Sequence, residues 1–136
     1  MSSSVFPMDA LKDFFKINFE KSILFAFLVG SSGTERFTEN SDVDIAIYWE
    51  KEPSLNDLLG LQSHLEETLH REIDLINLNH VDYIFSRQVL ETGRLIMNRA
   101  PGDFLRWQIK ILSIYPDFKF SRRVIEKNIL KRKKYV

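Results

Sequence analysis

The sequence predicts an α/β domain in which helices flank a small, mixed, twisted sheet. Short runs rich in β-branched and aromatic residues recur along the chain, as in ILFAFLV and DVDIAIYW, and they are too short for helices. Segments whose apolar residues follow a helical period alternate with these runs. A chain of 136 residues can bury one sizeable core, so we expect a single domain over residues 1–136.

The first 98 residues are expected to carry helices and strands in alternation. The clearest helix is the leucine-rich segment that begins at Ser54, a residue suited to capping a helix start. The first strand is uniformly apolar and therefore predicted to be buried. In order, the expected elements are a helix at 7–22, strands at 23–29 and 42–49, a helix at 54–70, a strand at 72–78, a helix at 82–93 and a strand at 94–98.

Helices are also expected in the last third of the chain. Pro101 and Gly102 predict a break after the fourth strand. Helical patterns follow at 103–115 and 121–134, separated by PDFKF. We therefore expect C-terminal helices, over about 102–134, that pack on the sheet through their aromatic residues.

Composition excludes several classes of function. Nineteen basic and nineteen acidic residues balance, so no global field favours a membrane or nucleic-acid partner. The absence of cysteine removes disulfides, thiolate zinc sites and thiol nucleophiles, and it fits a cytoplasmic location. The longest apolar run is far shorter than the roughly 20 residues that span a bilayer, and the charged helical segment before it does not resemble a basic leader.

The stretch VGSSGTERFTENSDVDIAI carries the first candidate site. Residues two apart in a strand face the same side, so Asp42 and Asp44 project together from bases roughly 7 Å apart. No cation lies between them in the sequence, so a hard divalent ion is the simplest partner. Upstream, Gly30 allows close backbone approach to a phosphate, and Ser31 can donate to its oxygens.

A third carboxylate, Asp74, lies inside the apolar strand EIDLINL. If that strand neighbours the Asp42–Asp44 strand, Asp74 completes a cluster of three carboxylates facing a phosphate cradle. Such a cluster suits two-metal phosphoryl transfer, and the reaction expected is nucleotidyl transfer from a nucleoside triphosphate. Glu72 has the same strand spacing and is an alternative third ligand, although its place at the strand mouth favours a surface salt bridge.

These residues resemble a known signature. Gly30-Ser31, ten intervening residues, Asp42-Val43-Asp44 and a later strand with Asp74 are similar to the Gly-Ser-x10-Asp-x-Asp pattern of the polymerase-β-like nucleotidyltransferases. The short length and the ending YPDFKFSRR are similar to the minimal nucleotidyltransferases, the MNT group, which are encoded beside HEPN-domain ribonuclease toxins. The resemblance spans nearly the whole chain and implies the polymerase-β-like nucleotidyltransferase fold.

The resemblance also implies a function. The chain would be an antitoxin that acts as a Mg²⁺-dependent protein adenylyltransferase, transferring AMP from ATP to a tyrosine of a cognate HEPN ribonuclease toxin with which it forms a stable complex. By position, Gly30 and Ser31 would hold the triphosphate. Asp42 and Asp44 would ligate one or two Mg²⁺ ions, and Asp74 would ligate metal and help to activate the tyrosine hydroxyl.

Alternatives to this function remain open. The antitoxin could neutralise a ribonuclease by binding alone, or the transferase could act on a small molecule or an RNA end. His64, His70 and His80 lack the register of a zinc site, and Ser31 has no partner that would make it a nucleophile.

The basic residues near the end of the chain also have two interpretations. The tail KRKKYV, with Arg122, Arg123 and Lys127 nearby, is expected to be a solvated helix end, and we do not expect direct nucleic-acid binding there. Arg106 and Asp117 could reach the nucleotide or the partner, or form a structural ion pair.

Overall fold

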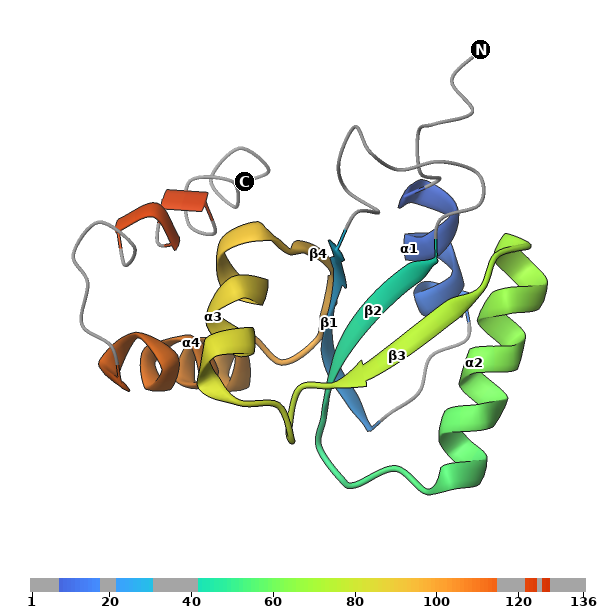
Figure 1. The fold of residues 1–136 in the computed structure, drawn as a ribbon, viewed down its shortest axis with the longest axis horizontal. Coiled ribbons are helices and arrows are strands. Elements are labelled where there is room, and N and C mark those ends of the chain that lie inside the picture. Colours follow the sequence, from blue (N-terminus) through green and yellow to red (C-terminus); the bar gives the residue numbers. More distant parts are fainter. Residues whose placement is uncertain (1–7, 18–21, 31–41, 115–121, 125, 128–136) are drawn as a thin grey trace, which may run out of the picture.

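A computed structural model describes residues 8–17, 22–30, 42–114, 122–124 and 126–127. Its core is a four-stranded sheet in the order β3-β2-β1-β4 with four described helices around it (Figure 1). The elements are α1 (Met8–Ile17), β1 (Ile23–Val29), β2 (Val43–Trp49), α2 (Leu55–Leu69), β3 (Ile73–Asn77), α3 (Tyr83–Thr92), β4 (Arg94–Asn98) and α4 (Pro101–Ile114).

The sheet is mixed, as the sequence predicts. β1 pairs antiparallel with both β2 and β4, whereas β2 and β3 run parallel. The parallel pair needs a crossover, and α2 supplies it. Consequently the end of β1 lies beside the beginnings of β2 and β3.

Helices cover both faces of the sheet. Figure 1 shows α1 and α2 on one side and α3 and α4 on the other. Each pair of helices closes a separate apolar cluster against its own face of the strands. All seven residues of β1 are buried, because this strand contributes side chains to both clusters.

Local capping fixes where the helices begin. Ser54 accepts a hydrogen bond from the Asp57 backbone N–H, and the Asp57 carboxylate accepts one from the Ser54 N–H, which completes a capping box at α2. At α3 the Asp82 carboxylate accepts a hydrogen bond from the Phe85 N–H and caps the helix start. The predicted cap at Ser54 is therefore confirmed.

The predicted break at Pro101 and Gly102 is wrong, because both residues belong to α4. Proline is accepted in the first turn of a helix, where its missing N–H needs no partner. The Phe104 N–H already donates to the Ala100 carbonyl across this first turn.

Only part of the last expected helix, at 121–134, falls within the described residues. Residues 122–124 are helical, and Val124 is buried in the cluster beneath α3 and α4. No helix in the described part of the chain is both long and apolar enough to cross a membrane.

Candidate active site

One end of the sheet gathers the predicted site residues. β1 ends at Val29, and Val29 is the register partner of Asp44 on β2. Asp44 is in turn the register partner of Asp74 on β3. Three strands therefore bring the end of β1, Asp44 and Asp74 into one row, as the sequence predicted for neighbouring strands.

The carboxylates lie on the face of the sheet that α3 and α4 cover. Ala46, two residues beyond Asp44, packs in the cluster under α3 and α4, and Ile76, two residues beyond Asp74, packs against the same cluster. Since alternate strand residues share a face, Asp44 and Asp74 project to that side. Asp44 is half-buried, and Asp74 is exposed.

Burial and neighbouring carboxylates both act on Asp44. Partial burial raises the pKa of Asp44 above its ordinary value, and the charges of Asp74 and Asp42 and a hydrogen bond with Asp74 raise it further. Each of these causes disfavours the charged form of Asp44. The site thus gathers the carboxylates of Asp42, Asp44 and Asp74 at one end of the sheet.

Gly30 follows β1 at the same end of the sheet and has a positive φ of 74°. A Cβ atom on Gly30 would lie 2.8 Å from Asp44 Oδ2, closer than real Cβ contacts. Glycine at this position therefore leaves space for the Asp44 carboxylate and permits the left-handed backbone. Ser31, the other predicted phosphate ligand, lies outside the described residues.

Glu72, which the sequence offered as an alternative third ligand, lies beside Asp42. Its backbone carbonyl accepts from the Val43 N–H, which sets Glu72 beside the start of β2. A hydrogen bond with Asp42 and the charge of Asp42 raise the pKa of Glu72. The structure thus places Glu72 next to another carboxylate, whereas the sequence favoured a surface salt bridge.

The four carboxylates associate in two pairs, Asp44 with Asp74 and Asp42 with Glu72. Among the described residues, no three Asp, Glu or His side chains already converge as a metal-binding group. The donor set nevertheless fits a hard cation, because it consists of carboxylate oxygens, and partial burial together with the charges of Asp74 and Asp42 raises the pKa of Asp44.

Comparison with known proteins identifies the family to which this arrangement belongs. Residues 9–101 match the family model for polymerase beta nucleotidyltransferases, and this match includes Gly30, Asp42, Asp44 and Asp74. The chain belongs to the polymerase beta nucleotidyltransferase family. The match runs from α1 to the first residue of α4.

A relative from Methanocaldococcus jannaschii, named "Putative protein adenylyltransferase", is 32% identical over 65 residues, which span 48% of this chain and 70% of the relative. A chain in the crystal structure of a toxin–antitoxin with AMP-PNP has a TM-score of 0.66 at 21% identity, covering 91% of this chain and 98% of that one. A chain in the structure of a tri-AMPylated Shewanella oneidensis HEPN toxin with its MNT antitoxin has a TM-score of 0.62 at 18% identity, covering 90% and 98%. The structural likenesses establish the polymerase-β-like nucleotidyltransferase fold.

The histidines of this nucleotidyltransferase lie apart from one another. The His64 ring packs edge-on against Phe14 with centroids 4.9 Å apart, and His70 is the left-handed C-cap of α2. His80 contacts Glu52 with 2.6 Å between Nε2 and Oε1. The three residues therefore contribute to packing, a helix end and a surface pair.

Arg106 forms the structural ion pair that the sequence left as one alternative. Its guanidinium donates to Asp103 at 2.7 Å, one turn away on α4. Asp117 lies outside the described residues.

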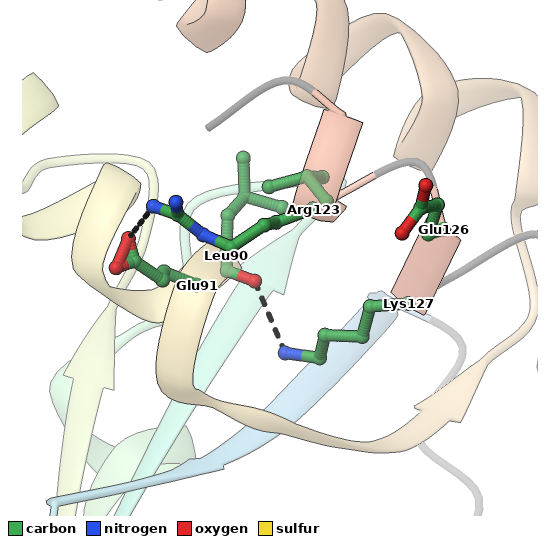
Figure 2. A pocket seen from close by; sticks show the side chains of 6 residues that line it. Leu90, Glu91, Arg123, Glu126 and Lys127 are labelled. Atoms are coloured by element: carbon green, nitrogen blue, oxygen red, sulfur yellow. Dashed lines mark hydrogen bonds and ion pairs between the residues drawn. The ribbon is translucent and has the colours of Figure 1, made fainter. Parts of the chain in front are cut away.

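The basic residues near the end of the chain hold that segment against α3. A cavity of about 450 Å³ lies between these residues and α3. Figure 2 shows the contact of Arg123 with Glu91 at this cavity. The Lys127 ammonium donates to the Leu90 carbonyl at 3.0 Å and to the Gly93 carbonyl at 2.5 Å. A cation at the end of a helix offsets the partial negative charge of its last carbonyls. Arg123 and Lys127 therefore stabilise the docking of the C-terminal segment.

Proposed function

We propose that this nucleotidyltransferase is an antitoxin that transfers AMP from ATP to a tyrosine of a HEPN ribonuclease toxin and thereby inactivates the ribonuclease. The observation that carries the proposal is the half-buried Asp44, which lies beside Asp74 on β3 and close to Gly30 at the end of β1. The name of the archaeal relative and the complexes of MNT antitoxins with HEPN toxins among the similar folds support the acceptor class.

In this proposal Asp42, Asp44 and Asp74 hold Mg²⁺, and two ions are expected. When bound, the metal would neutralise part of the phosphate charge and lower the pKa of the attacking tyrosine hydroxyl. Gly30 and Ser31 position the triphosphate at the end of β1, because the glycine lets the backbone approach its oxygens and the serine can donate to them.

The reaction is an in-line displacement at the α-phosphorus of ATP. The tyrosine oxygen forms a bond to that phosphorus, the bond to the β-phosphate oxygen breaks, and pyrophosphate leaves. Asp74, at the exposed edge of the row, accepts the phenolic proton. Asp44, held beside Asp74 by the register of β2 and β3, would hold the cation that neutralises the phosphate charge, since the carboxylate and the phosphate repel each other.

Intact-mass spectrometry of a candidate HEPN toxin tests this function. The toxin is incubated with this chain, ATP and Mg²⁺, in parallel with an Asp42→Asn/Asp44→Asn variant and with Glu67→Gln, which changes an exposed carboxylate on α2. We expect whole AMP units on a toxin tyrosine with the native chain and with Glu67→Gln, and none with the double variant.

The same experiment separates the alternatives. A toxin that stays unmodified, yet is neutralised equally by the native chain and the double variant, would establish an antitoxin that acts by binding alone. AMP transfer to a small molecule or to an RNA end in place of the toxin would keep the enzyme and change its acceptor.

A further inference from the structure

A second hollow lies on the α3/α4 face at the other end of the sheet. It has a volume of about 310 Å³ and is lined by residues of β2, α3, α4 and the loop after β3. Tyr48 on β2 lines it and shares a face with Asp44, four residues earlier. Four residues of strand span roughly 13 Å, so this hollow is separate from the carboxylate row.

Aromatic side chains form fixed walls of the hollow. The Tyr48 ring stacks on Phe25, with centroids 4.7 Å apart and an interplanar angle of 4°. Trp107, which also lines the hollow, packs against Phe25 at 5.1 Å and against Phe104 at 6.2 Å. Because Phe25 is fully buried, the walls that it supports are already ordered before any ligand binds.

One small polar residue contributes to the wall of the same hollow. Ser86 lines the hollow and is only 4% exposed. Its backbone N–H donates to the Asp82 carbonyl at the start of α3. The Ser86 hydroxyl gives the hollow one side-chain group that can both donate and accept a hydrogen bond.

The charges around the hollow favour an anion. Asp103 neutralises Arg106 through their 2.7 Å ion pair. Lys110 has no carboxylate partner among the described residues, and its ammonium lies over the Tyr83 ring, 5.9 Å from the centroid. Among the described residues that line the hollow, Asp103, Arg106 and Lys110 therefore leave a net positive charge, and Lys110 lies beside an aromatic ring.

We infer that this hollow binds a ring-bearing anion of about the size of a nucleoside monophosphate. Its ring would lie among Tyr48, Tyr83 and Trp107, its anionic group would contact Lys110, and Ser86 would donate to a polar atom of the ring or sugar. The volume lies near the lower end of the range of known ligand pockets, which suits a single small ligand. This inference does not depend on the proposed transferase activity.

NMR titration of the full chain with AMP, in EDTA so that no metal supports nucleotide binding at the carboxylates, tests the inference. The chain contains two tryptophans, and only Trp107 lines the hollow, so its indole N–H signal reports on binding while that of Trp49 serves as an internal control. We expect saturable shifts of the Trp107 indole and the Ser86 amide. We also expect Lys110→Gln to weaken binding about tenfold, since hydrogen bonds to charged groups contribute energies of that order. Lys12→Gln, an exposed charge change on α1, should have no effect.

Adenosine and inorganic phosphate distinguish the parts of the proposal. We expect each to bind more weakly than AMP. Inorganic phosphate that binds as tightly as AMP would overturn the role of the ring, and adenosine that does so would overturn the role of the anion. Saturable shifts confined to Gly30 and Asp44, or no shifts at all, would overturn the site itself.

Discussion

Gly30→Ala is the substitution that most directly tests the geometry of the carboxylate row. The new Cβ would lie 2.8 Å from Asp44 Oδ2, so Asp44 must move away from its present position beside Asp74. The φ of 74° adds strain, because a left-handed conformation costs an L-residue about 1–2 kcal/mol. We therefore expect both stability and activity to fall.

The expected magnitudes follow from these two effects. A loss of about 1–2 kcal/mol lowers the melting temperature by roughly 3–8 °C in a domain of this size. Displacement of a catalytic group by a fraction of an ångström to an ångström can reduce the rate about 100-fold. Thermal unfolding followed by circular dichroism measures the first quantity, and the initial rate of AMP transfer measures the second.

Gly60→Ala provides the matched control. Gly60 lies within α2, and an added Cβ there would meet no atom within 4 Å. Alanine in a helix interior is more favourable than glycine by about 0.5–1 kcal/mol, so this variant should be slightly more stable and fully active. If Gly30→Ala matched Gly60→Ala in stability and transfer rate, the close approach of residue 30 to Asp44 would have no functional meaning.

Three further predictions concern the charges of the fold. Because the pKa of Asp44 is raised in the folded state, ionising Asp44 costs more there than in the unfolded chain, so the metal-free protein should gain stability as pH falls toward the ordinary value of 3.8. For the same reason Asp44→Asn should be more stable than the native chain at pH 7 in EDTA. Urea denaturation at several pH values measures both effects, and an unchanged profile would contradict the raised pKa. Mg²⁺ should raise the melting temperature of the native chain but not that of Asp42→Asn/Asp44→Asn in thermal scans with and without the ion, and equal shifts would argue against these ligands. Lys127→Met, which removes the donor to the Leu90 and Gly93 carbonyls, should lower the free energy of unfolding by about 1–3 kcal/mol in urea denaturation; a value unchanged from the native one would mean that this contact adds nothing to the docking of the C-terminal segment.

Much of the fold was accessible from the sequence because periodicity and burial agree along most of it. The apolar run at 23–29 is a central strand buried on both faces, and the leucine pattern after Ser54 is a capped helix. The prediction failed at Pro101, where the sequence was interpreted as a break and the structure begins α4. Proline can mark either a break or the first turn of a helix. The packing of Phe104 and Trp107 on the sheet favours the helix that begins at Pro101.

The sequence predicts the individual carboxylates of the site, but their mutual contacts depend on how the strands pair. Strand spacing alone places Asp42 and Asp44 on one side, but the contact of Asp44 with Asp74 requires the parallel pairing of β2 and β3. No local pattern indicates that Glu72 meets Asp42, since this contact depends on the hydrogen bond from the Val43 N–H to the Glu72 carbonyl. The requirement for glycine at position 30 likewise depends on tertiary structure, because only the folded chain brings Asp44 close to residue 30.

The register of β3 connects the core to the site. Ile73 is buried against α1 and α2, and Leu75 packs on the same cluster, whereas Asp74 between them faces the other side. A slip of one residue would turn both apolar side chains away from that core and drive the Asp74 carboxylate into it, at a large energetic cost. The hydrophobic contacts of Ile73 and Leu75 therefore select the one register in which Asp74 lies beside Asp44. Partial burial and the charge of Asp74 both raise the pKa of Asp44. The two carboxylates nevertheless stay aligned, because the core specifies this register independently of any favourable interaction between them.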